Sequence, residues 1–165
     1  MRDVFSPPLW SSLGEKERRR LVKSEEMFVA LRRLAPPERQ REWFRLLIVD
    51  WSAVSELVLR RAYNSVEAPL DAGPHKPLGD LATDFRKALK AGSNTWAYED
   101  RPRMYAALNG LDVLWLLNHI NKRAGKHLSG DEIAWEDVLS VQPGLYRALR
   151  ALLDVASNPP VAAIH

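Results

Sequence analysis

Apolar residues recur every three to four positions along most of this chain, and that spacing restricts the fold to packed helices. The pattern is densest over residues 37–63, where we predict the central helix. Leu46, Val49 and Leu57 widen its apolar face so far that this helix should be covered on more than one side. Asp50 interrupts the face, and a carboxylate there must either be paired or face outward. The main stripe consists of Phe44, Leu47, Ile48, Trp51, Val54 and Val58.

Four other segments share this period and are bounded by helix start and stop signals. Pro36-Pro37 separates the first two helices, and Gly92 ends the third. Gly110 lies inside the fourth helix, where the missing side chain favours close packing against a neighbour. Pro143-Gly144 lies inside the last helix, where we expect a break or a kink. The predicted helices span residues 13–34, 37–63, 78–91, 102–125 and 131–156.

The predicted elements define an all-α protein, an antiparallel bundle of about five to six helices. No alternating apolar pattern is long enough to predict a strand. A chain of 165 residues fits one domain that buries its own core. Pro7 and Pro8 should prevent a helix at the start. We therefore expect an irregular N-terminal segment over residues 1–12, a single bundle domain over 13–156 and a flexible C-terminal tail over 157–165.

Composition and motifs exclude several classes of protein. The chain has no cysteine, which excludes disulfides and thiolate metal sites. No apolar run reaches the roughly 18 residues of a membrane span, and the first residues lack the apolar core of a signal peptide. Phosphate-binding glycine loops, nucleophile motifs and histidine spacings suited to a metal are also missing. We therefore expect a cytoplasmic protein with no cofactor, no bound metal and no membrane contact.

Two of the four histidines and several basic or amide groups gather at the end of the predicted helix 102–125. A histidine can move a proton near neutral pH, and a guanidinium can hold a phosphate. One hypothesis is therefore RNA cleavage, with His119, Arg123 and His127 as the catalytic residues. The alternative is an ordinary helix end, because cations and a following glycine stabilise a helix C-terminus. The residues themselves leave both interpretations open.

The order of parts resembles the HEPN superfamily of helical bundles. A long apolar helix ends in Leu57-Val58-Leu59-Arg60-Arg61-Ala62-Tyr63, and after a variable loop the next helix opens with Leu78-Gly79-Asp80-Leu81. Another long helix, a short polar and basic segment and a final helix complete the layout, over about residues 40–156. The resemblance implies a metal-independent ribonuclease of a toxin or phage-defence system, or an inactive relative that only binds. It also implies a dimer that joins two polar segments.

The polar segment departs from the HEPN pattern, in which an arginine precedes a histidine at a restricted range of spacings. Arg123 stands one residue too close to His127. Asn121 stands at a suitable distance but replaces the arginine. If the fold resemblance holds, this departure still puts the nuclease activity in question.

Basic residues elsewhere in the chain extend the candidate surface for a polyanion. Against this, the net charge is only +3, and acidic residues alternate with basic ones along residues 15–26. Ion pairs between successive helical turns explain that stretch without any ligand. The residues predicted to contact nucleic acid are Asn121, Lys122, Lys126, Arg60, Arg61, Arg101 and Arg103.

Six tryptophans are many for this length, and aromatic side chains either fill cores or stack on bases. Trp51 and Trp115 lie on apolar stripes and are predicted core residues. Trp10, Trp96 and Trp135 lie in or near predicted loops. These three are therefore the better candidates for contact with a partner.

These observations support a first hypothesis, a helical protein associated with RNA or another nucleic acid, of the HEPN type. A second hypothesis is a non-enzymatic scaffold that forms a homodimer or joins a larger protein assembly, suggested by the apolar surface of residues 37–63. A third is an enzyme for a small molecule that uses Asp50 with a histidine. The sequence decides neither whether the protein is an enzyme nor which partner it binds.

Overall fold

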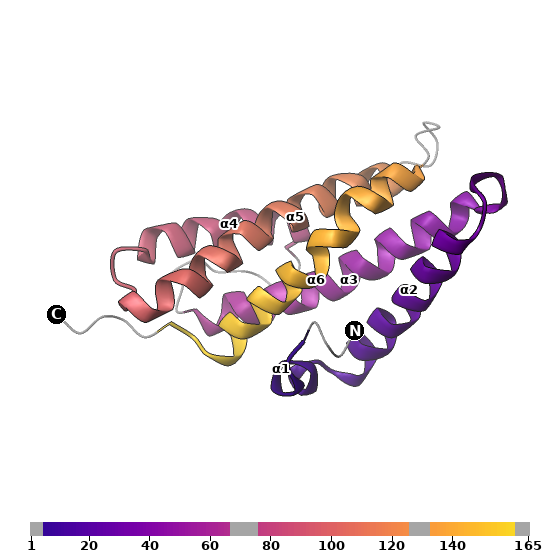
Figure 1. Cartoon of the computed structure of the whole chain (residues 1–165). Helices are drawn as coiled ribbons and strands as arrows, with labels where there is room; N and C mark the ends of the chain where they lie inside the picture. The colour runs from indigo at the N-terminus through magenta and orange to yellow at the C-terminus, as the bar shows by residue number, and fades with distance from the viewer. Residues whose placement is uncertain (1–4, 67–75, 126–132, 161–165) are drawn as a thin grey trace.

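A computed structural model describes residues 5–66, 76–125 and 133–160, which form six α-helices and no β-strand (Figure 1). The all-α class predicted from the periodicity is therefore confirmed. The helices are α1 (Pro7–Ser12), α2 (Glu15–Arg33), α3 (Arg41–Ser65), α4 (Leu78–Gly92), α5 (Arg101–Gly125) and α6 (Trp135–Ser157). Two short 3-10 helices, Pro36–Glu38 and Tyr98–Asp100, precede α3 and α5.

The central helix of the bundle is α3, which packs against α2, α4, α5 and α6. Its buried side chains include Leu47, Ile48, Trp51 and Val58, as the apolar stripe predicted. They belong to one continuous hydrophobic core to which all six helices contribute. The burial of this apolar surface is the main force that holds the bundle together.

The longest helix contact joins α5 and α6, which run in antiparallel directions (Figure 1). Arg103, near the start of α5, contacts Asp154, near the end of α6. At the opposite ends of the two helices, Arg123 contacts Asp137. The two ion pairs therefore fix the direction of the pair.

Glycine allows this pair of helices to approach closely, as predicted for position 110. A Cβ atom at Gly110 would lie 3.0 Å from the Cα of Ala148. Across the same interface, a Cβ atom at Gly144 would lie 2.9 Å from a methyl carbon of Val113. Both distances are shorter than ordinary side-chain contacts, and the one at Gly110 is with a backbone atom, so a side chain at position 110 would push α5 and α6 apart.

The start of the chain corrects one prediction, because residues 7–12 are helical and not irregular. Pro7 and Pro8 occupy the first turn of α1. Backbone N–H groups in a first turn have no helical partner, so proline loses nothing there. α1 then buries Leu9 against the core.

The last helix corrects part of another prediction, because α6 runs unbroken from Trp135 to Ser157 with Pro143 inside it. A proline at this position removes the hydrogen bond to the carbonyl of Leu139. Both residues lie on the exposed side of α6, where water can satisfy that carbonyl. α6 is therefore not broken at Pro143-Gly144, and the alternative of a kink there stays a prediction.

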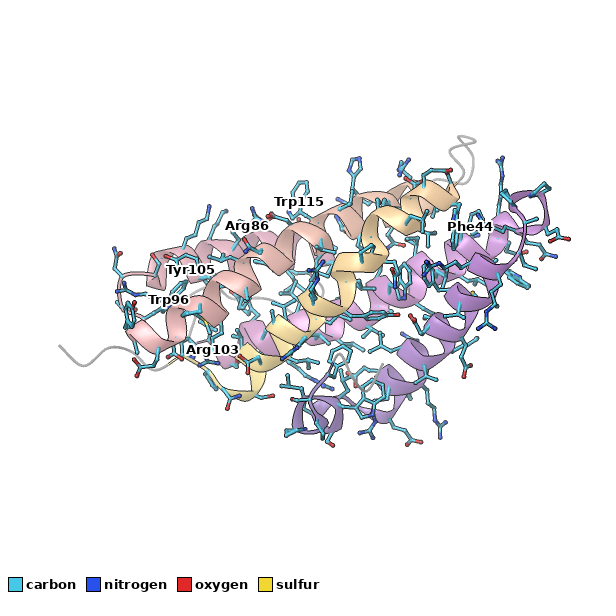
Figure 2. All side chains as sticks on the ribbon, in the orientation of Figure 1. Phe44, Arg86, Trp96, Arg103, Tyr105 and Trp115 are labelled. Carbon is cyan, nitrogen blue, oxygen red and sulfur yellow. The ribbon has the colours of Figure 1, made fainter. Side chains whose placement is uncertain are left out.

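The division of the tryptophans into buried and exposed residues differs from the prediction (Figure 2). Trp51 is buried as expected, but Trp115 on α5 is 50% exposed, and its indole N–H donates to Thr83. Trp96 is only 5% exposed and packs edge-on against the ring of Tyr105. Trp135 stacks on the ring of Phe28, with 5.5 Å between ring centroids.

A buried phenol gives the fold a testable pH dependence. The hydroxyl of Tyr146 donates a hydrogen bond to Glu25, which joins α6 to α2. Burial raises the pKa of Tyr146 far above its ordinary value, and the hydrogen bond and negative charge of Glu25 add to the rise. The folded state therefore keeps a proton that the unfolded chain releases above about pH 10.

We expect the contribution of Tyr146 to stability to be fully present below about pH 10 and to be lost progressively as the pH rises further. The loss should approach about 1.4 kcal/mol per pH unit. Urea unfolding at successive pH values measures it, and Tyr146→Phe should remove this part of the decline. An unchanged pH profile in that variant would contradict the assignment.

Candidate functional site

The predicted catalytic cluster lies at the end of α5, and the structure describes only part of it. Arg123 donates a hydrogen bond to Asp137 at the start of α6. The other carboxylate oxygen of Asp137 accepts the backbone N–H of Ala134 at 2.9 Å. His119 and Lys122 are exposed, and Asn121 is half-buried. Arg123 thus links the end of α5 to the start of α6, which is a structural role.

Lys126 and His127 lie outside the described residues. The described geometry therefore gives no distance between either of them and Arg123 or His119. RNA cleavage by His119, Arg123 and His127 stays a prediction. The interpretation of this segment as a helix end gains support, since Asp137 neutralises the guanidinium that a phosphate would need.

Two predicted nucleic-acid contacts, Arg60 and Arg61, hold the end of α3 in place. Arg60 donates to Glu56 at 2.8 Å and to the backbone carbonyl of Lys76 at 2.6 Å. Arg61 donates to Glu17 at 2.6 Å and to the carbonyl of Ser12 at 2.9 Å. Glu17 is only 4% exposed, so its negative charge requires this partner.

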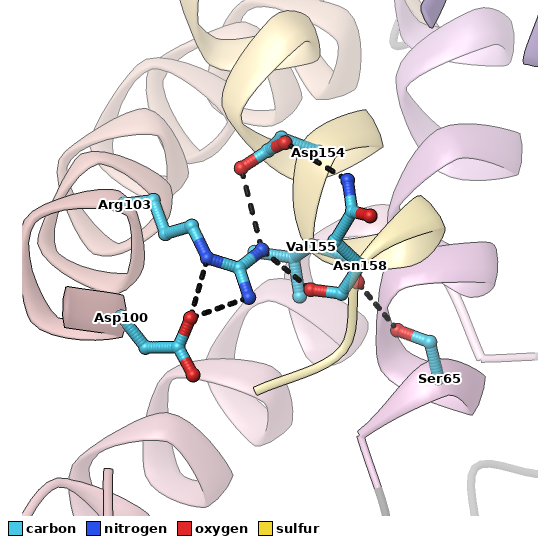
Figure 3. Close-up of polar contacts among 6 residues, drawn as sticks. All are labelled: Ser65, Asp100, Arg103, Asp154, Val155 and Asn158. Carbon is cyan, nitrogen blue, oxygen red and sulfur yellow. Dashed lines mark hydrogen bonds and ion pairs between the residues drawn. The ribbon is translucent and has the colours of Figure 1, made fainter. Parts of the chain in front are cut away.

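Arg103 is tied into the bundle in the same way (Figure 3). Its guanidinium donates to Asp100 at 2.8 Å and to Asp154 at 3.4 Å. It also donates to the backbone carbonyl of Asn158, just beyond α6. Arg101 is exposed, and its guanidinium carbon lies 5.9 Å from the ring centroid of Tyr98.

The candidate residues do not form one surface. Arg101 and Arg103 lie at the start of α5, whereas Lys122 and Arg123 lie at its end. Twenty helical residues separate the two groups by about 30 Å. Since Arg103, Arg123 and the pair in α3 all have carboxylate partners, little of the predicted cationic surface is available for a polyanion.

The central helix carries an exposed apolar face, part of the broad apolar surface that suggested a scaffold. Leu46, Val49 and Leu57 are 44%, 43% and 42% exposed. The central helix is covered on more than one side, as predicted, by α2, α4, α5 and α6, but these helices do not cover the face with Leu46, Val49 and Leu57. Asp50 is half-buried beside them and forms no ion pair or hydrogen bond with the part of the chain that the structure describes. Of the two alternatives expected, an ion pair is therefore absent among the described residues.

No protein-family model matches the chain, and no curated protein or solved structure is similar enough to count as a match. Among the described residues, no group of three or more histidine, aspartate and glutamate side chains is placed to hold a metal ion. Within the same residues, none of the helices combines the length and the apolar character needed to cross a bilayer.

Proposed function

We propose that this protein is a non-enzymatic helical scaffold that works as a homodimer, joined through the exposed face of α3. The observation that carries the proposal is the row formed by Leu46, Val49, Ala53 and Leu57. These residues recur at helical spacing on one side of α3, and the three large ones are more than two-fifths exposed. An apolar row of this kind is typical of a helix that packs against a partner.

This row can pack against the same row of a second copy when the two α3 helices run in opposite directions. In a twofold pair centred near residue 51, Leu46 lies opposite the partner's Leu57, and Val49 lies opposite the partner's Ala53. The small side chain of Ala53 then lies opposite the larger one of the partner's Val49 at the centre of the interface, which favours close packing of helices. The same match occurs twice, as the symmetry of a dimer requires.

Charged residues on one flank of the row match in the same register. Glu42, Arg45, Glu56 and Arg60 lie along this flank by their helical spacing. In an antiparallel twofold pair, each flank meets its own copy. Glu42 then faces the partner's Arg60, and Arg45 faces the partner's Glu56. Every such pair joins opposite charges, which gives the pairing its specificity.

The expected affinity is modest. Burying the exposed part of each large side chain contributes roughly 1 kcal/mol, so six of them contribute about 6 kcal/mol. The loss of rotational and translational freedom opposes association. The ion pairs on the flanks lie at the rim and add little. About 6 kcal/mol alone corresponds to a Kd of tens of micromolar, so with the cost of association the Kd should lie between about 0.1 and 1 mM.

Sedimentation equilibrium over a wide concentration range tests the proposal. The apparent mass should rise with concentration from the 18.8 kDa of one chain towards twice that value. A mass that stays at one chain up to millimolar concentration would reject the homodimer.

A further inference from the structure

A groove of about 690 Å³ lies where α1 meets the start of α5 and the second half of α6. Pro8, Leu9, Ala106 and Ala151 give it apolar walls. Its volume falls within the range of roughly 300–1,000 Å³ that is usual for small-molecule sites. No residue of α3 lines the groove, so it is separate from the proposed dimer face.

Two arginines in the groove are available to a ligand. Arg147 and Arg150 are exposed and form no hydrogen bond or ion pair within residues 5–66, 76–125 and 133–160. They lie three positions apart on α6, so their side chains share one side of the helix and can reach the same group. This contrasts with the arginines of the predicted cationic surface that have carboxylate partners.

Among the described residues that line the groove, the one carboxylate, that of Asp154, is already engaged. Asp154 accepts a hydrogen bond from Arg103, which also binds Asp100 (Figure 3). These contacts hold Arg103 at the edge of the groove. They also reduce the repulsion that Asp154 would exert on an anion. The lining therefore has a net positive charge that Arg147 and Arg150 supply.

We propose that this groove binds a phosphorylated small molecule. A phosphate monoester carries a charge between about −1.5 and −2 near neutral pH, which matches the two guanidiniums that have no partner among the described residues. The planar guanidinium donates two parallel hydrogen bonds to phosphate oxygens. Ser6 and Ser157 line the groove and supply further donors. The apolar walls cover the organic part of the ligand.

Isothermal titration calorimetry of the full chain with adenosine monophosphate tests this site at physiological salt. The wild-type chain should bind the nucleotide, and adenosine without its phosphate should bind far more weakly. The Arg147→Gln/Arg150→Gln variant should weaken binding between about 10- and 100-fold, since it removes charge-assisted hydrogen bonds. Both residues are exposed, so the fold should be retained, which the circular dichroism melt verifies.

A matched control changes the same charge elsewhere. Arg32 and Arg33 are exposed at the end of α2, far along the chain from the groove. The Arg32→Gln/Arg33→Gln variant should bind the nucleotide like wild type. Equal weakening in both double variants would reduce the effect to net charge and overturn the proposal.

Two other results would also overturn it. One is a wild-type chain that does not bind adenosine monophosphate at millimolar concentration. The other is a short oligoribonucleotide that binds through Arg147 and Arg150 while the mononucleotide does not, which would assign the groove to a polyanion. The dimer proposal would survive either result, because Arg147 and Arg150 take no part in the α3 face.

Discussion

A Leu57→Glu variant is expected to stay monomeric at concentrations where the wild-type chain dimerises. The proposed pairing places Leu57 against the partner's Leu46, so the substitution introduces two carboxylates into the interface of each dimer. A carboxylate removed from water without a partner costs several kcal/mol. The Kd should therefore rise at least ~100-fold, which sedimentation equilibrium measures. Because Leu57 is 42% exposed in one chain, the fold should tolerate the change.

The matched control for this variant is Leu139→Glu. Leu139 is also 42% exposed, but it lies on α6, outside the α3 face. That variant should dimerise like the wild-type chain. Equal loss of dimer in the two variants, or an unaffected dimer in Leu57→Glu, would refute the α3 interface.

Exchanging charged residues tests whether the two α3 helices pair in this antiparallel register or associate only through their apolar side chains. Arg45→Glu alone places two like charges opposite each other at both ends of the pair, and dimerisation should weaken by about tenfold. Adding Glu56→Arg restores opposite charges, and the dimer should recover. The second change also replaces the part-buried ion pair between Glu56 and Arg60 with two like charges in the same chain, so the fold of the double variant is checked by its circular dichroism melt. A double variant no tighter than the single one would contradict this register.

The periodicity of α3 predicted a helix but not which apolar residues are covered. Leu46 and Leu47 are adjacent and chemically identical, yet Leu47 is fully buried and Leu46 is exposed. The difference arises because α2, α4, α5 and α6 surround only part of α3. A hydrophobic pattern indicates which side chains are shielded from water. It does not indicate whether they are buried by the same chain or by a partner.

For charged residues too, the sequence indicates only those partners that lie nearby in the chain. The pair of Arg60 with Glu56 is one helical turn apart, so the spacing alone could have indicated it. The partner of Arg61 is Glu17, which is distant in the sequence and meets it only through the packing of α2 on α3. The local sequence of Arg147 and Arg150 does not differ from that of a solvated helix face. Only the fold shows that neither has a partner in the part of the chain that the structure describes.

The close contact of α5 with α6 leads to the largest expected effect on stability. Gly110→Val should lower the free energy of unfolding by about 3 kcal/mol. A Cβ atom at this position would lie 3.0 Å from the Cα of Ala148, and a backbone atom cannot move aside as a flexible side chain does. The two helices must therefore separate, which opens the core between them. Overpacking of this kind typically costs about 1–3 kcal/mol.

Asn109→Val provides the matched control for Gly110→Val. Asn109 is the preceding residue of α5 and is exposed, so its variant introduces the same branched side chain without a steric conflict. It should change the free energy of unfolding by less than about 0.5 kcal/mol. Urea unfolding of both variants measures the difference directly. If Gly110→Val unfolds at the same urea concentration as Asn109→Val, then α5 and α6 can separate at no cost, and their close approach does not stabilise the bundle.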